Sequence, residues 1–409
     1  MTTMSDPPSE SFRPSQLLND TRYRSYTFQF IALLCLIGLM AFLGINLVRN
    51  LAAAGLNISF EFLGEPAGYD INQRLLEYDS QSSHWRASVV GALNTLLVAF
   101  VGCILATIIG VVVGVLRLSK NWLISKIMSV YVEIFRNVPV LVWILIVMAV
   151  FVAVLPQPRD FRGDSPEASM FLDLFAFTGR GFYFPQPYFT VEWATGSTGW
   201  LIIIALLVGA LFGTRAMLAR ATRIQEATGV RPNTLWINLA IWFVPLILAC
   251  VIMGLAWDIP ELRGFNFQGG IFARNSFIAL TLALSIYTAA FIAENVRAGI
   301  LAVSKGQTEA AASLGLRPNR IMNLVILPQA LRVIIPPLIS QYLNLTKNSS
   351  LAIAVGYMDL TGTLGGITLN QTGRAIECVL LLMLFYLTFS LAISAIMNVY
   401  NNAVKLKER

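Results

Sequence analysis

Charged residues are scarce in this chain. Only 12% of its 409 residues are Asp, Glu, Lys or Arg, whereas about 25% is typical of a soluble domain. So little charge is too little to cover a protein surface in water, and the mean hydropathy of +0.68 agrees with this. The composition therefore excludes an ordinary soluble fold and predicts a protein that has the lipid bilayer as its solvent.

Side chains for metal and redox chemistry are also few. The chain has one histidine, His84, and four cysteines, which all lie in apolar runs without C-x-x-C spacing. This excludes a zinc site of the usual kind and gives no support to disulfides, so we expect no bound metal. Because His84 stands beside Trp85 at the start of an apolar run, we expect it in the aromatic belt at the membrane surface.

Two further classes of function lack their motifs. No G-x-x-x-x-G-K-[ST] loop occurs, so we do not expect this chain to bind ATP. No basic patch alternates with aromatic residues, and the net charge of +7 falls in loops where lipid headgroups attract it, so we expect membrane lipid and no nucleic acid as partners. A membrane enzyme is disfavoured because catalytic groups do not cluster. An ion-coupled secondary transporter of small polar solutes remains the alternative.

Long apolar runs are what the sequence does have. A helix needs about 20 apolar residues to cross the hydrocarbon core. The fold class we predict is an all-α integral membrane protein with about eight transmembrane helices. The predicted spans are 28–48, 90–116, 127–155, 200–218, 236–257, 276–299, 326–346 and 377–400. The seventh contains Pro336 and Pro337, so we expect a kinked helix packed inside protein.

Lys and Arg indicate the orientation. With a cytoplasmic N-terminus, 17 of the 29 basic residues fall in cytoplasmic connections. Both termini are therefore predicted to be cytoplasmic. The domains we expect are a cytoplasmic tail 1–27, an extra first span with an extracytoplasmic loop 28–89, a core segment 90–156, an insertion 157–275 with an outer loop and two extra spans, a second core segment 276–400 with a cytoplasmic loop 301–325, and a tail 401–409. We expect the outer loop after residue 157 to be ordered but without regular secondary structure.

The stretch EAAASLGLRPNRIMNLVILP, residues 309–328, is unusual between two apolar spans. Its alanines favour a helix, and Glu309 is placed near the N-terminal end, where the helix dipole favours an acid. Gly315 permits a bend before a second short helix. We expect Ala310, Ala311 and Ala312 to form a small-residue face on which the backbone of another protein can lie closely.

Ionisable and polar residues in the spans are candidates for a path or gate, because they are costly in a membrane. Glu133 with Arg136, and Glu294 with Arg297, are spaced i, i+3 and are predicted to pair. They could be structural ion pairs or could exchange partners during transport. The irregular segment 344–366 could line a path or be an outer loop without substrate contact. Its candidate residues are Lys347, Asn348, Ser349 and Ser350.

The pattern Glu309, Ala310, Ala311, Gly315, Val325, Leu327, Pro328 closely resembles the EAA motif of membrane subunits of ABC importers. Val325 stands where isoleucine is more usual. GALNTLLVAF (91–100) resembles the opening of the family's conserved transmembrane unit. The segments that resemble the polar amino acid branch are VEIFRNVPVLV (132–142, with Asn137 and Pro139), AENVRAGILAVSKGQTEAA (293–311) and KNSSLA (347–352). The resemblance covers residues 90–156 and 276–400, and implies a five-helix permease core. The extra spans and outer loops resemble the larger subfamily for general L-amino acids or glutamate, glutamine, aspartate and asparagine.

The resemblance implies a division of labour. A periplasmic amino acid binding protein would deliver substrate, and two permease subunits in the bacterial inner membrane would form the path. A cytoplasmic ATPase dimer would use ATP and Mg, so this chain would bind no cofactor and would not be an enzyme. The loop with Glu309, Gly315, Arg317 and Leu327 would be the coupling contact with the ATPase. The second permease could be another copy, but the large insertion favours a heterodimer with a homologue.

Overall fold

The computed structural model describes residues 21–55, 57–162 and 167–404, so the predicted tails lie largely outside the described residues. The chain divides into two units, residues 1–62 and 63–409. The first unit provides α2 (Thr21–Ala53), a single apolar helix, and the start of the short 3-10 helix η1 (Glu61–Gly64). All other elements belong to the second unit.

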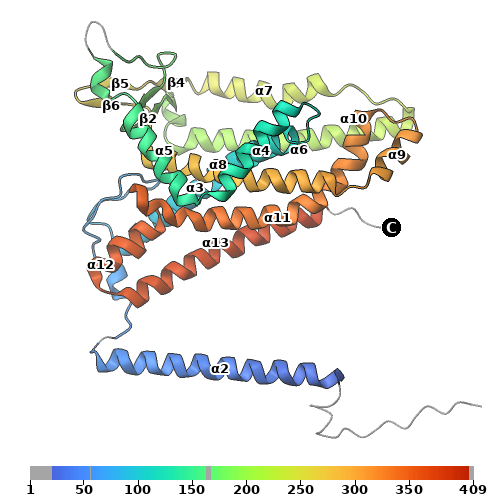
Figure 1. The fold of residues 1–409 in the computed structure, drawn as a ribbon. Helices are drawn as coiled ribbons and strands as arrows, with labels where there is room; N and C mark the ends of the chain where they lie inside the picture. Colours follow the sequence, from blue (N-terminus) through green and yellow to red (C-terminus); the bar gives the residue numbers. More distant parts are fainter. Residues whose placement is uncertain (1–20, 56, 163–166, 405–409) are drawn as a thin grey trace, which may run out of the picture. The chain divides into compact units, whose positions relative to one another are not determined.

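The second unit is mostly helical (Figure 1). In the described chain, seven helices are long and apolar enough to cross a membrane, and one bent pair makes an eighth span. The predicted fold class of a helical membrane protein with about eight spans is therefore confirmed. Besides α2, the spans are α3 (His84–Leu116), α4 (Trp122–Asn137) with α5 (Val140–Val154), α6 (Ser197–Thr228), α7 (Leu235–Ile252), α8 (Asn275–Leu301), α11 (Leu327–Asn348) and α13 (Ala375–Val404).

The third predicted span is not one straight helix. The axes of α4 and α5 differ in direction by 107°. Val138 has extended backbone, with φ −104° and ψ 134°, as a residue before proline prefers. Pro139 then precedes α5 as its N-cap. The prediction of a continuous span over 127–155 was wrong because the Asn-Val-Pro sequence ends one helix and begins another.

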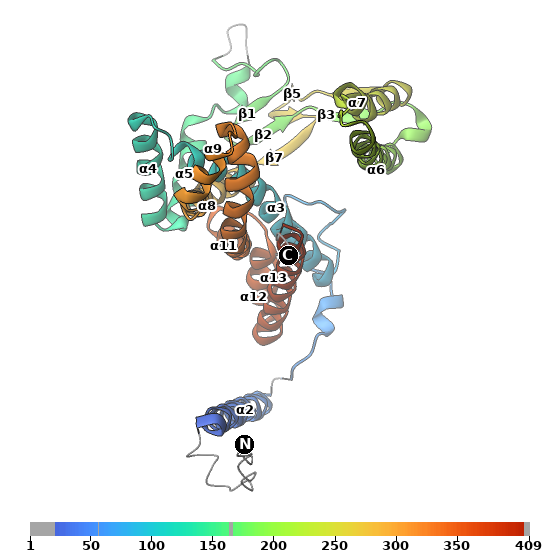
Figure 2. The ribbon, with the colours of Figure 1, turned by 90° about the vertical axis from the view of Figure 1, so that its right-hand side faces the viewer.

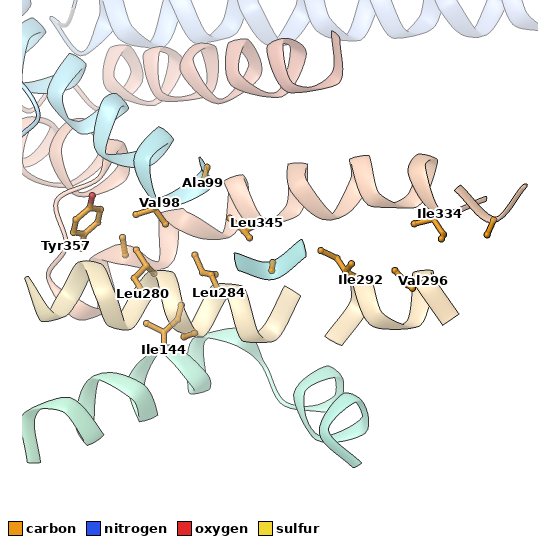
Figure 3. Packing of buried hydrophobic residues seen from close by; sticks show 14 residues of the cluster. Val98, Ala99, Ile144, Leu280, Leu284, Ile292, Val296, Ile334, Leu345 and Tyr357 are labelled. Carbon is orange, nitrogen blue, oxygen red and sulfur yellow. The ribbon is translucent and has the colours of Figure 1, made fainter. Parts of the chain in front are cut away.

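The hydrophobic core lies around α8. About 67% of its apolar window is buried, more than in the other candidate spans of the described chain. Aliphatic side chains of α3, α5 and α11 pack against it, among them Val98, Ile144 and Leu345 (Figure 3). At Gly110 of α3 an added Cβ would lie 2.7 Å from the Cβ of Ile292 on α8. A residue without a side chain is needed there for the two membrane helices to approach so closely.

The seventh span differs from its prediction. α11 is one continuous α-helix through Pro336 and Pro337. Only 22% of the apolar window of the span Pro318–Val355, to which it belongs, is buried. The enclosed helix is α8 instead. The irregularity precedes α11, where α9 (Lys305–Ser313) and α10 (Pro318–Ile321) lead into the π-helix η4 (Met322–Ile326).

Short strands form in the insertion, where we expected a loop without regular structure. β1 (Ala176–Thr178), β2 (Gly181–Phe184) and β7 (Ile271–Arg274) form an antiparallel sheet (Figure 2). β3 (Gln186–Phe189) pairs with β4 (Leu255–Asp258). A third pair joins β5 (Glu261–Arg263) to β6 (Asn266–Gln268). The turns η2 (Pro158–Phe161) and η3 (Glu192–Ala194) complete the region. The β2–β7 and β3–β4 pairs, which we call the β-ribbon, join residues before α6 to residues after α7. The β-ribbon therefore closes the base of the α6–α7 hairpin.

The connection between α11 and α13 is helical but irregular. It consists of the 3-10 helix η5 (Ser349–Val355), the π-helix η6 (Thr361–Thr368) and the short α12 (Leu369–Thr372). Gly356 ends η5 with a left-handed backbone, φ +68°. This connection and the α9–η4 segment lie at opposite ends of α11 (Figure 1).

Candidate coupling and translocation sites

The turn after α9 is formed by Gly315. Its φ is +76°, and an added Cβ would find no atom within 4 Å. The N–H of Gly315 donates to the carbonyl of Ala312 (2.9 Å), and the N–H of Leu316 donates to that of Ala311 (3.4 Å). These are the two hydrogen bonds of a Schellman helix end. Glycine is favoured at position 315 because residues with a Cβ resist the left-handed backbone conformation. Crowding is not the reason, since the space around an added Cβ is open.

The face of α9 differs from the one we expected. Glu309, Ala310 and Ala312 are exposed, but Ala311 is buried. Successive residues of an α-helix point about 100° apart, so three alanines in a row cannot share one face. Glu309 lies in the second turn of α9, which begins at Lys305, so the dipole argument for it was also wrong.

The other residues of the motif join α9 to the core. Arg317 is the N-cap of α10, Val325 lies in η4, and Leu327 and Pro328 begin α11. Leu314, which we did not predict as part of this surface, is 81% exposed beside Gly315. Its position at the end of an alanine-rich helix could have predicted this exposure, because the small neighbouring side chains provide no hydrophobic core for a leucine.

Glu294 on α8 is held by arginines from three helices. Its carboxylate accepts a hydrogen bond from Arg117 at the end of α3 and lies 3.9 Å from Nη1 of Arg136 on α4. Arg297, one turn along α8, donates to it at 3.2 Å, so the predicted Glu294–Arg297 pair is present. Arg117 also donates to the hydroxyl of Ser129 at 3.1 Å. The sequence argument missed Arg117 because it is 177 residues from its partner.

The predicted pair of Glu133 and Arg136 was wrong. Within the described chain Glu133 forms no ion pair, and its carboxylate accepts a hydrogen bond from Nδ2 of Asn137 at 3.4 Å. Arg136 lies toward α8, with its guanidinium carbon 5.4 Å from the ring centroid of Phe291. The exchange of ion-pair partners during transport stays a hypothesis.

The four polar residues proposed for a path lie where α11 passes into η5. Ser349 is buried and donates to the carbonyl of Thr346 (2.7 Å), while Ser350 donates to that of Lys347 (2.8 Å). Lys347 is exposed and Asn348 half-buried. The two hydroxyl protons therefore cap the end of α11.

Three residues on one face of α3 hold the connection that follows η5. Nδ2 of Asn94 donates to the carbonyl of Met358 (2.8 Å), and Oγ1 of Thr95 accepts from the N–H of Leu360 (3.1 Å). At Gly91 an added Cβ would lie 3.1 Å from Cα of Leu360. These residues belong to GALNTLLVAF, so the structure gives this motif a physical reason: it seats the irregular backbone.

A buried acid, Asp359, was missed by the sequence argument. Its Oδ1 accepts from the N–H of Gly362 (2.8 Å), and the hydroxyl of Tyr386 donates to Oδ2 (3.4 Å). Its side chain is fully buried, and this burial raises its pKa to about 6 in spite of the hydrogen bonds that favour the charged form.

His84 is not in an exposed belt. It is only 3% exposed, and its Nδ1 lies 3.1 Å from Oγ1 of Thr368 at the end of η6. The hydroxyl of Tyr69 lies 3.0 Å from the same oxygen. The expectation failed because the connection before α3 folds over the histidine.

A cavity of about 530 Å³ lies beside η6, and we call it the π-helix cavity. Its lining residues come from η5, η6, α12 and the segment between them, and none carries a formal charge. They are Ile353, Gly356, Tyr357, Met358, Gly362, Gly366, Ile367, Asn370 and Gln371. Among the described residues no group of three or more His, Cys, Asp or Glu could hold a metal ion. The cavity can hold a small solute by amide and backbone hydrogen bonds.

Comparison with known proteins agrees with these features. Residues 233–406 match the family described as binding-protein-dependent transport system inner membrane component. The chain is 53% identical, over the full length of both proteins, to the glutamate/glutamine/aspartate/asparagine transport system permease protein BztB of Rhodobacter capsulatus. It is 44% identical to the general L-amino acid transport system permease protein AapQ of Rhizobium johnstonii, over 98% of this chain and 96% of that protein.

A shorter relative matches only part of the chain. The probable glutamine ABC transporter permease protein GlnM of Bacillus subtilis is 37% identical over 186 residues, which are 44% of this chain and 81% of that protein. The full-length matches decide the family. The chain belongs to the amino acid permease proteins of binding-protein-dependent ABC transport systems, which are multi-pass membrane proteins.

Proposed function

We propose that this chain is the permease subunit of an ATP-driven importer of L-amino acids in the bacterial inner membrane. The relatives that it matches over their whole length are permeases for glutamate, glutamine, aspartate and asparagine, or for L-amino acids in general. The chain would form part of the path for amino acids released by a periplasmic binding protein. Family membership supports this function and gives no support to an ion-coupled secondary transporter.

The observation that carries the proposal is the exposed turn of α9 and Gly315. Glu309, Ala310 and Leu314 are exposed on a short helix that follows α8 after only three residues. On its other side α10 and η4 lead directly into α11. A partner that binds and moves α9 would therefore act on two helices of the core at once.

Further partners follow from the proposed function. An ATPase dimer would bind α9 from the cytoplasm, where both termini also lie, and would bind ATP and Mg itself. This chain would bind no cofactor, metal or nucleic acid. We favour a homologous second permease over a second copy, because the insertion adds α6 and α7, of which only 6% and 0% of the apolar windows are buried in this chain. Membrane lipid would cover what the second subunit leaves exposed.

The test replaces Gly315 with alanine and uses Gly229→Ala as a matched control. Both glycines follow the end of a helix, with φ of +76° and +74°, and have open space around them. The left-handed backbone should cost alanine about 1–2 kcal/mol at either site. We expect Gly315→Ala to lower both co-purification of the ATPase and ATP-driven uptake by about 5–30-fold, because the strain opposes docking. Glu309→Lys should lower both as well, whereas the control Gly229→Ala should lower neither. Normal ATPase binding and uptake in Gly315→Ala and Glu309→Lys would refute the assignment of α9 as the ATPase contact.

A further inference from the structure

We propose that the π-helix cavity is a contact site for the amino acid in transit, and that it holds the solute without regard to the charge of its side chain. The proposal takes the class of solute from the proposed function. It goes beyond that function by assigning the residues that meet the solute and by stating what they do not select.

The backbone around the cavity is the first argument. Its wall combines a 3-10 helix, a left-handed glycine and a π-helix. Within a membrane such irregular backbone persists only where protein buries it or where it lines a wet cavity, and π-helical turns occur frequently at functional sites. Here one side of the connection is buried against α3 by Asn94 and Thr95. Its other side is the wall of the cavity.

Two glycines of η6 keep that wall open. A Cβ added at Gly362 or Gly366 would approach no atom closer than 3.4 Å, so packing does not require glycine at either position. Gly91, in contrast, must be glycine for the opposite side of the connection to pack. Because these positions carry no side chain, the wall is formed by backbone and the volume of the cavity stays open.

The polar groups of the cavity are neutral. Nδ2 of Asn370 donates to the carbonyl of Gly366 (2.8 Å). The remaining donor and acceptor sites of the Asn370 and Gln371 amides suit both the carboxylate and the ammonium group of an amino acid. The nearest acid, Asp359, is fully buried and already accepts from Gly362 and Tyr386. With no fixed charge in the lining, glutamate and glutamine should bind alike and weakly. Weak binding is what conduction requires, since a tightly held solute does not leave.

The position and size fit a solute on its way in. α11 has 22 residues, about 33 Å of helix. The α9 segment precedes it, and η5 and α12, which contribute lining residues of the cavity, follow its other end. Figure 1 shows α9 and α12 at the two ends of α11. If α9 meets the ATPase, the cavity lies on the side from which the binding protein delivers. Its volume of about 530 Å³ is within the range of small-molecule sites.

The test fills the cavity with Ile353→Trp and uses Ile204→Trp on α6 as the control. Ile353 and Ile204 are 56% and 55% exposed, so neither substitution places a larger side chain in the hydrophobic core. The complete complex, with binding protein, second permease and ATPase, is reconstituted in vesicles. Uptake per ATP hydrolysed is measured for L-glutamate, L-glutamine, L-aspartate and L-asparagine. We expect Ile353→Trp to lower uptake of the two larger amino acids about tenfold, as one unwanted group in a filled site can.

The pattern among the four amino acids decides the outcome. Aspartate and asparagine should lose less than glutamate and glutamine, and each acid should behave like its amide. Uptake equal to wild type would overturn the proposal, and so would a loss that follows charge rather than size. Release of the second permease by Ile353→Trp alone would also overturn it, by making the cavity a subunit contact. If the wild-type complex imports none of the four, the proposed function fails instead.

Discussion

Single residues explain why the connection between α11 and α13 keeps its shape. Asn94 and Thr95 of α3 form hydrogen bonds with the carbonyl of Met358 and the N–H of Leu360. These two backbone groups lie between η5 and η6, outside a regular helix. An unpaired buried backbone group costs about 1–3 kcal/mol, so each of these side chains stabilises the irregular segment by supplying a partner. Polar residues in a membrane span are here a means of holding backbone, and need not touch the solute.

Asp359→Asn should change how stability depends on pH. Burial raises the pKa of Asp359 to about 6, above that of an unfolded aspartate, so the folded protein binds this proton more tightly. Its ionisation therefore lowers stability as pH rises from about 4 through 6. Relative to wild type, the asparagine variant should gain about 1 kcal/mol between pH 5 and pH 7 in thermal unfolding in detergent.

Asp258→Asn is the control for this change, because Asp258 is exposed and also accepts from a glycine N–H, that of Gly270 at 2.8 Å. It gives the effect of the same chemical change at an exposed aspartate. Parallel curves for wild type and Asp359→Asn would show that the buried carboxyl does not titrate in this range.

Among the elements, the break between α4 and α5 and the arginines around Glu294 belong together. The turn at Pro139 directs α4 so that Arg136 lies 3.9 Å from the Glu294 carboxylate on α8, while Arg117 approaches from α3. One acid thus joins three helices near the start of the α9 segment. With three guanidinium groups around it, removal of the acid would leave like charges facing one another.

Glu294→Gln should loosen α4. Glu294 is 29% exposed, so we place the loss of unfolding free energy between that of exposed and buried ion pairs, at about 1–3 kcal/mol. Hydrogen exchange of residues 122–137 should rise in the same variant. Glu133→Gln, on α4 and without an ion pair in the described structure, should change stability by no more than about 0.5 kcal/mol. Equal effects of the two substitutions would exclude a special role for Glu294.

Local sequence patterns predicted most of these elements, but they did not predict contacts between residues far apart in the sequence. Apolar runs sufficed for the eight spans, and Gly315 for the turn after α9. The strands of the insertion were missed because β2 pairs with residues about 90 positions later, across α6 and α7. The contact of Glu294 with Arg117, 177 residues earlier, was missed for the same reason. Asp359 was missed because its side-chain partner Tyr386 lies on a separate helix, α13. Helix-face geometry could have corrected the alanine face, since neighbouring residues never share one side.

On the scale of the whole molecule, the chain consists of a permease core and added parts. GlnM matches only 44% of this chain, although the match covers 81% of GlnM. The α6–α7 hairpin leaves the core through the β-ribbon, and its helices pack mainly on each other. We therefore interpret the domains 90–156 and 276–400 as the path and the insertion 157–275 as a surface for other subunits.

The central claim is that this chain moves amino acids only when a separate ATPase acts on α9. Its most direct test is uptake of L-glutamate and L-glutamine into vesicles that contain the chain with its second permease, ATPase and binding protein. We predict uptake that requires ATP on the side of α9 and binding protein on the opposite side, and that is lost without either. Uptake by this chain alone, driven by an ion gradient and independent of ATP, would contradict the claim.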